Sequence, residues 1–467
     1  MKIYRSLDDL FESLPVASGL SISFHHHLRN GDGVQNLILK KMNELNITKL
    51  KLYPSAIFPV HTEMLKLLQK GAIESITTNY LNGSVAEYIA EHGLPNQLKM
   101  QTHGGRSRAI IEGETIIDIA FIAAPIVDEE GNAAGHDGPS ACGSLGYAIE
   151  DSVYAKHTIL ITDHLVKKLE QPQIFSQHVE AILVVDSLGD RQGIVSGTTA
   201  ITKDPVGLRI AANAAQLMDE LGLIKEGMNF QSGAGGISLK VTEHLKNTLK
   251  ARKLKAGFFS GGITQSHVNM LEDNLVNDLY DVQCFDLHAI QSLKKNPHHH
   301  AISAHDYANP ANPKRVIKDL DVVILGATEI DLDFNVNVTT DSYNTIIGGS
   351  GGHSDTATDS RVSIIVTPLF KARTPIIKER VNTITTLGKN IDCLVTERGI
   401  AINPKRTDLL AKLSNTHLPI YTIETLLNKA YEYTGVPQSY DLKAQKIGVV
   451  EDRDGTIIDT LHTKKRR

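Results

Sequence analysis

Short apolar runs alternate with amphipathic segments along the chain. The apolar runs are rich in β-branched residues and are bounded by Gly, Pro, Asp or Asn. Such runs are typical of buried strands in a parallel sheet. We therefore predict strands at Leu20–Phe24, Lys49–Tyr53, Ile116–Ala123, Thr158–Thr162, Ala181–Asp186, Val322–Leu325, Ser363–Thr367 and Cys393–Thr396.

The segments between these runs have the periodicity of helices. Examples are Gln35–Leu45, Glu63–Lys70 and Val85–His92. Strands that alternate with helices of this length form βαβ units, which predicts an α/β fold. A longer helix is predicted at Leu208–Leu221, because Asp204 followed by proline is typical of a helix start. We expect this helix to bridge the two halves of the chain.

Four landmarks of the first half recur in the second half in the same order. Their offset lies between 203 (321 minus 118) and 206 (267 minus 61) residues. The pairs are His61-Thr-Glu63-Met-Leu65 with His267-Val-Asn269-Met-Leu271, Asp118–Ala124 with Asp321–Ala327, Gly143–Gly146 with Gly348–Gly351, and Thr158–Thr162 with Ser363–Thr367. A nearly constant offset indicates duplication of a whole domain. We predict two mainly parallel α/β domains, residues 1–225 and 226–467, with a cleft between them.

Composition and charge exclude several classes of protein. The 467 residues are 41% hydrophobic and carry a net charge of -5, so no basic field favours nucleic acid or anionic lipid. Cys142, Cys284 and Cys393 are too far apart in sequence for a disulfide framework, which fits a reducing compartment. The start is charged, and no run approaches the roughly 18 apolar residues of a membrane helix. We expect a cytoplasmic protein with no membrane or nucleic-acid partner.

Two glycine-rich segments are the first candidates for a ligand site. In open α/β sheets ligands bind beyond the carboxyl ends of the strands, where Gln231–Ile237 and Gly348–Asp355 are predicted to lie. Consecutive N–H groups in such turns can hold a phosphate, a carboxylate or an oxyanion. Neither nucleotide-binding glycine motif is present. The alternative is a tight turn that simply needs small residues.

Other polar clusters allow more than one interpretation. Arg106 and Arg108 lie beside glycines, which suits a clamp for a polycarboxylate but also a solvated loop. Neither histidine triplet, His25–His27 or His298–His300, is followed four residues later by the histidine or carboxylate that a helical zinc site needs. We therefore predict no metal. No nucleophile elbow is present.

Several motifs together resemble a known superfamily. These are the HTEM-type segment at 267–270 after Gly262-Ile263, the GxGGI turn at 233–237, DIAFIAAPIVDEEGN at 118–132, GGSGGHSD at 348–355 and VTERGIA at 395–401, which are similar to segments of acetyl-CoA hydrolases and CoA-transferases. Within that superfamily, SFHHHLRNGD at 23–32, QSGAGGISL at 231–239 and PHHHAIS at 297–303 resemble the α subunits of bacterial citrate lyases. The resemblance covers essentially the whole chain.

The resemblance implies a fold, an activity and partners. The fold would be two tandem duplicated CoA-transferase-type (NagB/RpiA-like) domains. The activity would exchange acetate for citrate on a thioester, giving citryl thioester and acetate. The expected partners are a citrate lyase β subunit, which cleaves the citryl thioester, and an acyl carrier protein, the γ subunit, in a hetero-oligomer. No cofactor is expected to bind tightly, because the acyl thioester sits on CoA or on the carrier's CoA-like prosthetic group.

The resemblance also indicates site residues. Many CoA-transferases use a glutamate nucleophile, and the matching position here is Asn269, whose amide is a poor acyl acceptor. We therefore expect citrate to attack the thioester directly, with Asn269 orienting it; Glu272 is the fallback nucleophile and Glu63 is expected to be structural. The predicted oxyanion donors are Gly235, Gly236, Gly351 and Gly352. The predicted substrate-binding residues are Ser232, Gly233, Arg106, Gly349, Ser350 and His353.

Two other functions remain open from the sequence. A stand-alone CoA-transferase or acetyl-CoA hydrolase would need a nucleophilic glutamate, which Asn269 disfavours. A non-catalytic sensor of organic acids or sugar phosphates would bind without exchange. The choice between citrate and citramalate as substrate is not fixed by the motifs.

Overall fold

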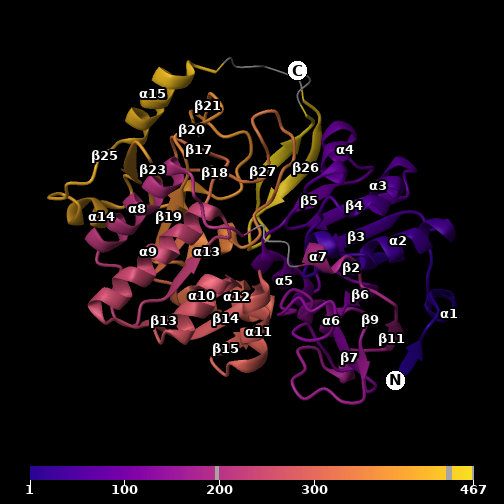
Figure 1. Ribbon diagram of the computed structural model, residues 1–467. Coiled ribbons are helices and arrows are strands. Elements are labelled where there is room, and N and C mark those ends of the chain that lie inside the picture. Colours follow the sequence, from indigo (N-terminus) through magenta and orange to yellow (C-terminus); the bar gives the residue numbers. More distant parts are fainter. Residues whose placement is uncertain (195–198, 438–443, 465–467) are drawn as a thin grey trace.

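Two large sheets dominate the computed structural model, which describes residues 1–194, 199–437 and 444–464 (Figure 1). Within these residues the first sheet has ten strands and the second sheet has nine. Each sheet is mainly parallel and has helices packed against it, so the α/β prediction is confirmed.

The first sheet is built mostly from the first half of the chain. Its strands pair in the order β1 (Lys2–Tyr4), β11 (Ala181–Val184), β9 (His157–Thr162), β6 (Ile119–Ala123), β2 (Ser21–Phe24), β3 (Leu50–Pro54), β4 (Ile73–Thr78), β5 (Leu98–Met100), β26 (Lys446–Glu451) and β27 (Ile457–His462). All neighbours are parallel except β26 and β27.

The second sheet repeats this arrangement. Its strand order is β15 (His299–Ala301), β14 (Val276–Cys284), β13 (Ala256–Ile263), β12 (Phe230–Ser232), β16 (Val322–Leu325), β19 (Val362–Val366), β23 (Cys393–Thr396), β24 (Gly399–Ile402) and β25 (Ile420–Tyr421). Read from β23 to β15, these strands follow the order in which β11 to β5 pair in the first sheet. The fold therefore carries the duplication seen in the sequence.

Equivalent side chains make equivalent contacts in the two halves. Asp118 Oδ2 accepts the backbone N–H of Ser21 at 2.9 Å, and Asp321 Oδ2 accepts that of Asn229 at 3.0 Å. Each aspartate precedes a central strand and ties it to the start of the neighbouring strand. The sequence landmark at 118 and 321 thus marks a repeated structural contact.

The helices lie where the periodicity placed them. The predicted segments correspond to α2 (Val34–Glu44), α3 (Thr62–Gln69), α4 (Ser84–His92) and α8 (Pro205–Glu220). The remaining helices are α1 (Leu7–Ser13), α5 (His103–Ile111), α6 (Ile149–Tyr154), α7 (Arg191–Ile194), α9 (Gly236–Arg252), α10 (Gln265–Glu272), α11 (Leu287–Lys295), α12 (Ala304–Ala308), α13 (His353–Asp359), α14 (Thr407–Lys412) and α15 (Ile423–Thr434). No helix among the described residues combines the length and the apolar character needed to cross a bilayer.

Two segments cross the predicted division at residue 225. Helix α8 buries Ile210, Ala214 and Leu217 in the core of the second half, so it belongs to that half rather than bridging the two. The C-terminal hairpin β26–β27 joins the edge of the first sheet beside β5, as the yellow arrows of Figure 1 show. The division at 225 remains a prediction, and sheet membership does not follow it at the end of the chain.

The junction between β5 and β26 predicts the effect of one substitution. A Cβ added at Gly448 would lie 2.5 Å from the carbonyl oxygen of Leu98, so Gly448→Ala should push the hairpin away from the sheet. Overpacking of this kind costs about 1–3 kcal/mol, so we expect a lower thermal melting temperature.

Gly326→Ala is the control for this prediction, because no atom of the described residues lies within 4 Å of a Cβ added there. Equal melting temperatures for the two variants would show that the hairpin is not tightly held.

Candidate active site

A cavity of about 670 Å³ lies between the two halves. Most of its wall comes from segments that follow the carboxyl ends of β12, β16 and β19 in the second sheet. The first half contributes Tyr80, His103 and Tyr147. The cavity therefore lies where an open α/β sheet places a ligand.

The glycine turn after β12 supplies free backbone donors to this cavity. Gly235 is the N-cap of α9 and makes no side-chain cap hydrogen bond. The N–H groups of Gly235 and Gly236 have no partner among the described residues, whereas the N–H of Gly233 donates to the carbonyl of Ile324 at 2.8 Å. A helix of this length carries partial positive charge at its N-terminus. Gly235 and Gly236 are therefore placed to stabilise an anion.

The second glycine loop, residues 348–352, packs against the first half. A Cβ at Gly349 would lie 2.3 Å from the carbonyl oxygen of Asn79, so only glycine fits there. The N–H of Gly351 donates to the same carbonyl at 3.2 Å. Gly351 is thus not free to act as an oxyanion donor, which corrects that part of its predicted role.

The part of the cavity wall that the structure describes carries no formal charge at neutral pH. Among the described residues that line it, none is Asp, Glu, Lys or Arg. Burial and, to a smaller extent, the nearby charge of Arg106 together lower the pKa of His103 to about 3. Burial also lowers the pKa of His353 to about 4. Both histidines are therefore neutral at pH 7 and act as polar groups rather than as cations.

The ring nitrogens of His353 are already engaged. Its Nε2 donates to the carbonyl of Gly326 at 2.9 Å, so its Nδ1 accepts from the hydroxyl of Thr386 at 2.8 Å. His103 differs, because its Nδ1 is buried without a partner among the described residues. His103 also packs on Tyr147, with ring centroids 4.1 Å apart.

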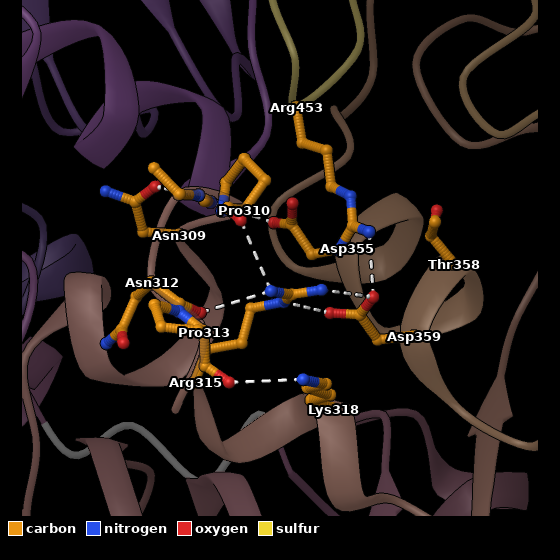
Figure 2. A network of polar contacts seen from close by, with 12 residues as sticks. Asn309, Pro310, Asn312, Pro313, Arg315, Lys318, Asp355, Thr358, Asp359 and Arg453 are labelled. Atoms are coloured by element: carbon orange, nitrogen blue, oxygen red, sulfur yellow. Dashed lines mark hydrogen bonds and ion pairs between the residues drawn. The ribbon is translucent and has the colours of Figure 1, made fainter.

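A network of ion pairs fixes α13, the helix that follows the second glycine loop (Figure 2). Arg453, from the turn of the C-terminal hairpin, donates to Asp359 Oδ1 at 2.7 Å, and Arg315 donates to both oxygens of the same carboxylate. One turn earlier, Asp355 accepts from the N–H of Gly104 at 2.9 Å and from the hydroxyl of Thr102 at 2.8 Å. The helix is therefore held by both halves of the chain.

Comparisons with known proteins agree with this geometry. A sequence model of the family described as "Citrate lyase, alpha subunit (CitF)" matches residues 1–464. The citrate lyase alpha chain of Haemophilus influenzae is 40% identical over 465 residues, covering 99% of this chain and 93% of that protein. The chain belongs to the citrate lyase α subunit family.

Solved structures support the same assignment. The putative citrate lyase α subunit of Streptococcus mutans, solved in complex with citrate, matches with a TM-score of 0.97 and 40% identity over 100% of this chain and 92% of that one. The malonate decarboxylase α subunit of Acinetobacter baumannii matches with a TM-score of 0.67 and 13% identity over 93% of this chain and 89% of that one, which shows a shared fold alone. As a citrate lyase α subunit, the chain is the CoA-transferase component of that enzyme.

Most of the predicted site residues of this α subunit come together in the cavity. The lining includes Ser232, Gly233, Gly235, Gly236, Gly349, Ser350, Gly351, Gly352 and His353. Arg106 does not line it. Its guanidinium is buried against Asp151, with N–O distances of 2.7 and 2.8 Å, and donates to the carbonyl of Tyr53 at 3.0 Å. The predicted substrate clamp is therefore corrected to an internal ion pair.

Asn269 also lies outside the cavity. On α10, His267 points inward, with its Nε2 3.4 Å from the hydroxyl of Ser232, and a residue two positions later lies about 200° around the helix. Asn269 accordingly lines a separate depression together with Glu272. Glu63 is outside the cavity as well and pairs with Lys66 at 2.6 Å. The predicted role of Asn269 in orienting citrate is thus corrected, because its side chain faces away from the cavity.

The two histidine triplets have different surroundings. His25–His27 are buried, and His298 and His300 both contact Asp278 at the surface, at 3.1 and 2.9 Å. The middle residue His299 contacts Asp281 Oδ2 at 3.0 Å, and the Cys284 thiol donates to the same oxygen at 2.8 Å. These three buried groups could ligate a metal ion, and the prediction of no metal stays a prediction.

Sequence reasoning missed several polar side chains of the wall. Gln231 is fixed at both ends, because its Oε1 accepts from Ser260 at 2.9 Å and its Nε2 donates to the Tyr307 hydroxyl at 2.8 Å. Gln283 and Tyr147 also line the cavity. Gln231 had a signal as the first residue of the glycine-rich segment Gln231–Ile237, and Tyr147 directly follows the repeated Gly143–Gly146 landmark, whereas Gln283 had none.

The internal ion pair of Arg106 predicts a stability defect without a substrate-binding defect. Arg106→Met leaves the buried carboxylate of Asp151 unpaired, which should lower the free energy of unfolding by about 3–5 kcal/mol. The KM for citrate of the folded variant should stay unchanged. Denaturant unfolding and steady-state kinetics measure the two quantities.

Arg252→Met is the matched control, because it breaks an exposed bidentate pair with Asp219 and should cost only about 0–1 kcal/mol. If Arg106→Met instead raised the citrate KM and left the free energy of unfolding unchanged, the predicted role of Arg106 in binding substrate would be correct.

The buried carboxyl of Asp355 predicts a pH effect on stability. Burial raises its pKa from 3.8 to about 7. The folded state therefore keeps this proton up to about pH 7, while the unfolded chain releases it near pH 4. The tighter proton binding stabilises the folded wild type at low pH, and this stabilisation is lost as the pH rises from about 4 to about 7. Asn does not titrate there. The melting temperature of Asp355→Asn relative to wild type should rise from pH 4 to pH 8, and a constant difference would contradict the shift.

Proposed function

We propose that this α subunit exchanges acetate for citrate on an acyl thioester by direct attack of a citrate carboxylate, with no covalent enzyme intermediate. The observation that supports this is the absence of Asp and Glu from the described wall of the cavity. A glutamyl thioester needs a carboxylate at the reacting carbonyl. The carboxylates considered from the sequence, Glu63 and Glu272, lie elsewhere.

The proposed chemistry has two steps. A citrate carboxylate oxygen attacks the acetyl carbonyl, the carbon–sulfur bond breaks, and a mixed anhydride and a thiolate form. The thiolate then attacks the citrate-derived carbonyl of the anhydride, and acetate leaves with the bridging oxygen. The products are citryl thioester and acetate, and no proton or electron is left over.

Both steps pass through an oxyanion that the chain can stabilise. The N–H groups of Gly235 and Gly236 at the start of α9, which have no partner among the described residues, are suitable donors, since preorganised N–H groups stabilise the negative charge that develops on the oxygen. The neutral wall supports the proposal in a second way, because it adds no negative charge that would repel an incoming carboxylate.

The thioester is proposed to arrive on the CoA-like prosthetic group of an acyl carrier protein. A citrate lyase β subunit would then receive the citryl thioester and cleave it. Membership of the α subunit family supports an assembly of this kind, since an α subunit is one component of a larger enzyme.

Oxygen labelling tests the absence of a covalent intermediate. In a single turnover with acetyl thioester and citrate labelled with ¹⁸O in its carboxylates, direct attack transfers one labelled oxygen from citrate to the released acetate. A glutamyl thioester route would instead release unlabelled acetate and leave the label on the enzyme. We expect labelled acetate and an unchanged intact mass of the chain.

Glu272→Gln and Glu63→Gln are the accompanying variants, and both should retain exchange because neither side chain lines the cavity. Unlabelled acetate, or an acylated glutamate in the wild type, would refute the proposal.

A further inference from the structure

Gln283 has an unusual position in the cavity wall. It lies on β14, next to the end of that strand, and its side chain is buried. Its Nε2 has no hydrogen-bond partner among the described residues, although its Oε1 is engaged. A buried amide donor without a partner is uncommon and indicates a missing acceptor.

A chain of hydrogen bonds from the first half fixes the orientation of this amide. Ser55 Oγ lies 2.6 Å from His26 Nδ1, and His26 Nε2 lies 3.2 Å from Gln283 Oε1. Burial holds the pKa of His26 well below its ordinary value, so the ring is neutral and carries one N–H. That hydrogen must be on Nε2, because the amide oxygen can only accept. The hydroxyl of Ser55 therefore donates to Nδ1.

Because of these hydrogen bonds, the Gln283 amide can offer a further partner only its N–H donors. With Oε1 occupied, Gln283 can offer its environment only the N–H groups of Nε2. Gln231, which lines the same cavity, differs because its Nε2 already donates to Tyr307. The partner of Gln283 Nε2 must therefore be a hydrogen-bond acceptor that enters the cavity.

The chemistry of the cavity indicates which acceptor this is. Citrate carries three carboxylates, yet the described wall contains no Lys or Arg to receive them. Neutral donors must then bind these groups, and an amide hydrogen bond to a charged acceptor is stronger than one to a neutral carbonyl.

We propose that Gln283 is a specificity-determining residue that donates a hydrogen bond from Nε2 to a carboxylate of citrate, and that Ser55 and His26 position it. The inference rests on the proposed function, in that citrate occupies this cavity. It adds a residue that recognises citrate rather than the acyl thioester.

Two substitutions of Gln283 test the donor. Gln283→Met keeps the length of the side chain and removes both polar atoms, and Gln283→Glu replaces the donor with a like charge. For the full chain we expect the dissociation constant of citrate, measured by calorimetry, to rise about 10- to 100-fold for Gln283→Met. It should rise further for Gln283→Glu. The KM for acetyl thioester should stay within about twofold.

Gln35→Met is the matched control. Gln35 is also a buried glutamine whose amide atoms have no partner among the described residues, but it lies on α2 and does not line the cavity. The control should keep the citrate affinity of the wild type. His26→Leu should weaken citrate binding less than Gln283→Met does, because the amide would remain but lose its fixed orientation.

The outcomes separate this inference from the proposed function. Unchanged citrate affinity in Gln283→Met, or a change confined to the thioester KM, would overturn the role of Gln283 while wild-type exchange and oxygen labelling stay as expected. A wild type that transfers no label would refute direct attack, whatever the citrate affinities of the variants.

Discussion

The close contact between the glycine loop 348–352 and the backbone of Asn79 determines how the two halves meet. The loop carries no side chain at Gly349, which lets the second half approach the first until backbone touches backbone. Asp355 and Asp359, on the helix that follows, then reach partners in α5 and in the C-terminal hairpin. The cavity between the halves depends on this approach, since a bulkier loop would separate the walls and admit water.

The electrostatics of the cavity follow from its burial. Desolvation keeps His103 and His353 neutral, and the charged groups nearby are paired with each other away from the wall. A reaction between a polyanion and a thioester is suited to such a lining. Fixed N–H dipoles can stabilise the developing negative charge, and no carboxylate in the described wall competes with the substrate as nucleophile.

The pattern of the sequence predicted the strands, the helices and the duplication, because burial of alternating elements leaves a periodic trace in the chain. It also located the glycine turns, since close backbone approach can be met only by glycine. It failed for Arg106 and Asn269, whose residue types suit a site but whose side chains point elsewhere. The direction of a side chain depends on the phase of its helix, as the inward His267 and the outward Asn269 show. Gln283 was missed because its role arises from contact with His26 in the other half of the chain.

The C-terminal hairpin has a consequence for biosynthesis. Strand β5 has one neighbour, β4, until β26 pairs with its other edge, and β26 lies almost 350 residues further along the chain (446 minus 98). During translation the first sheet therefore emerges with an open edge that can pair with other chains. Native closure of that edge must wait until β26 has left the ribosome. A contact of such long range slows folding, and it also means that a chain terminated early lacks both its edge protection and the Arg453 anchor of α13.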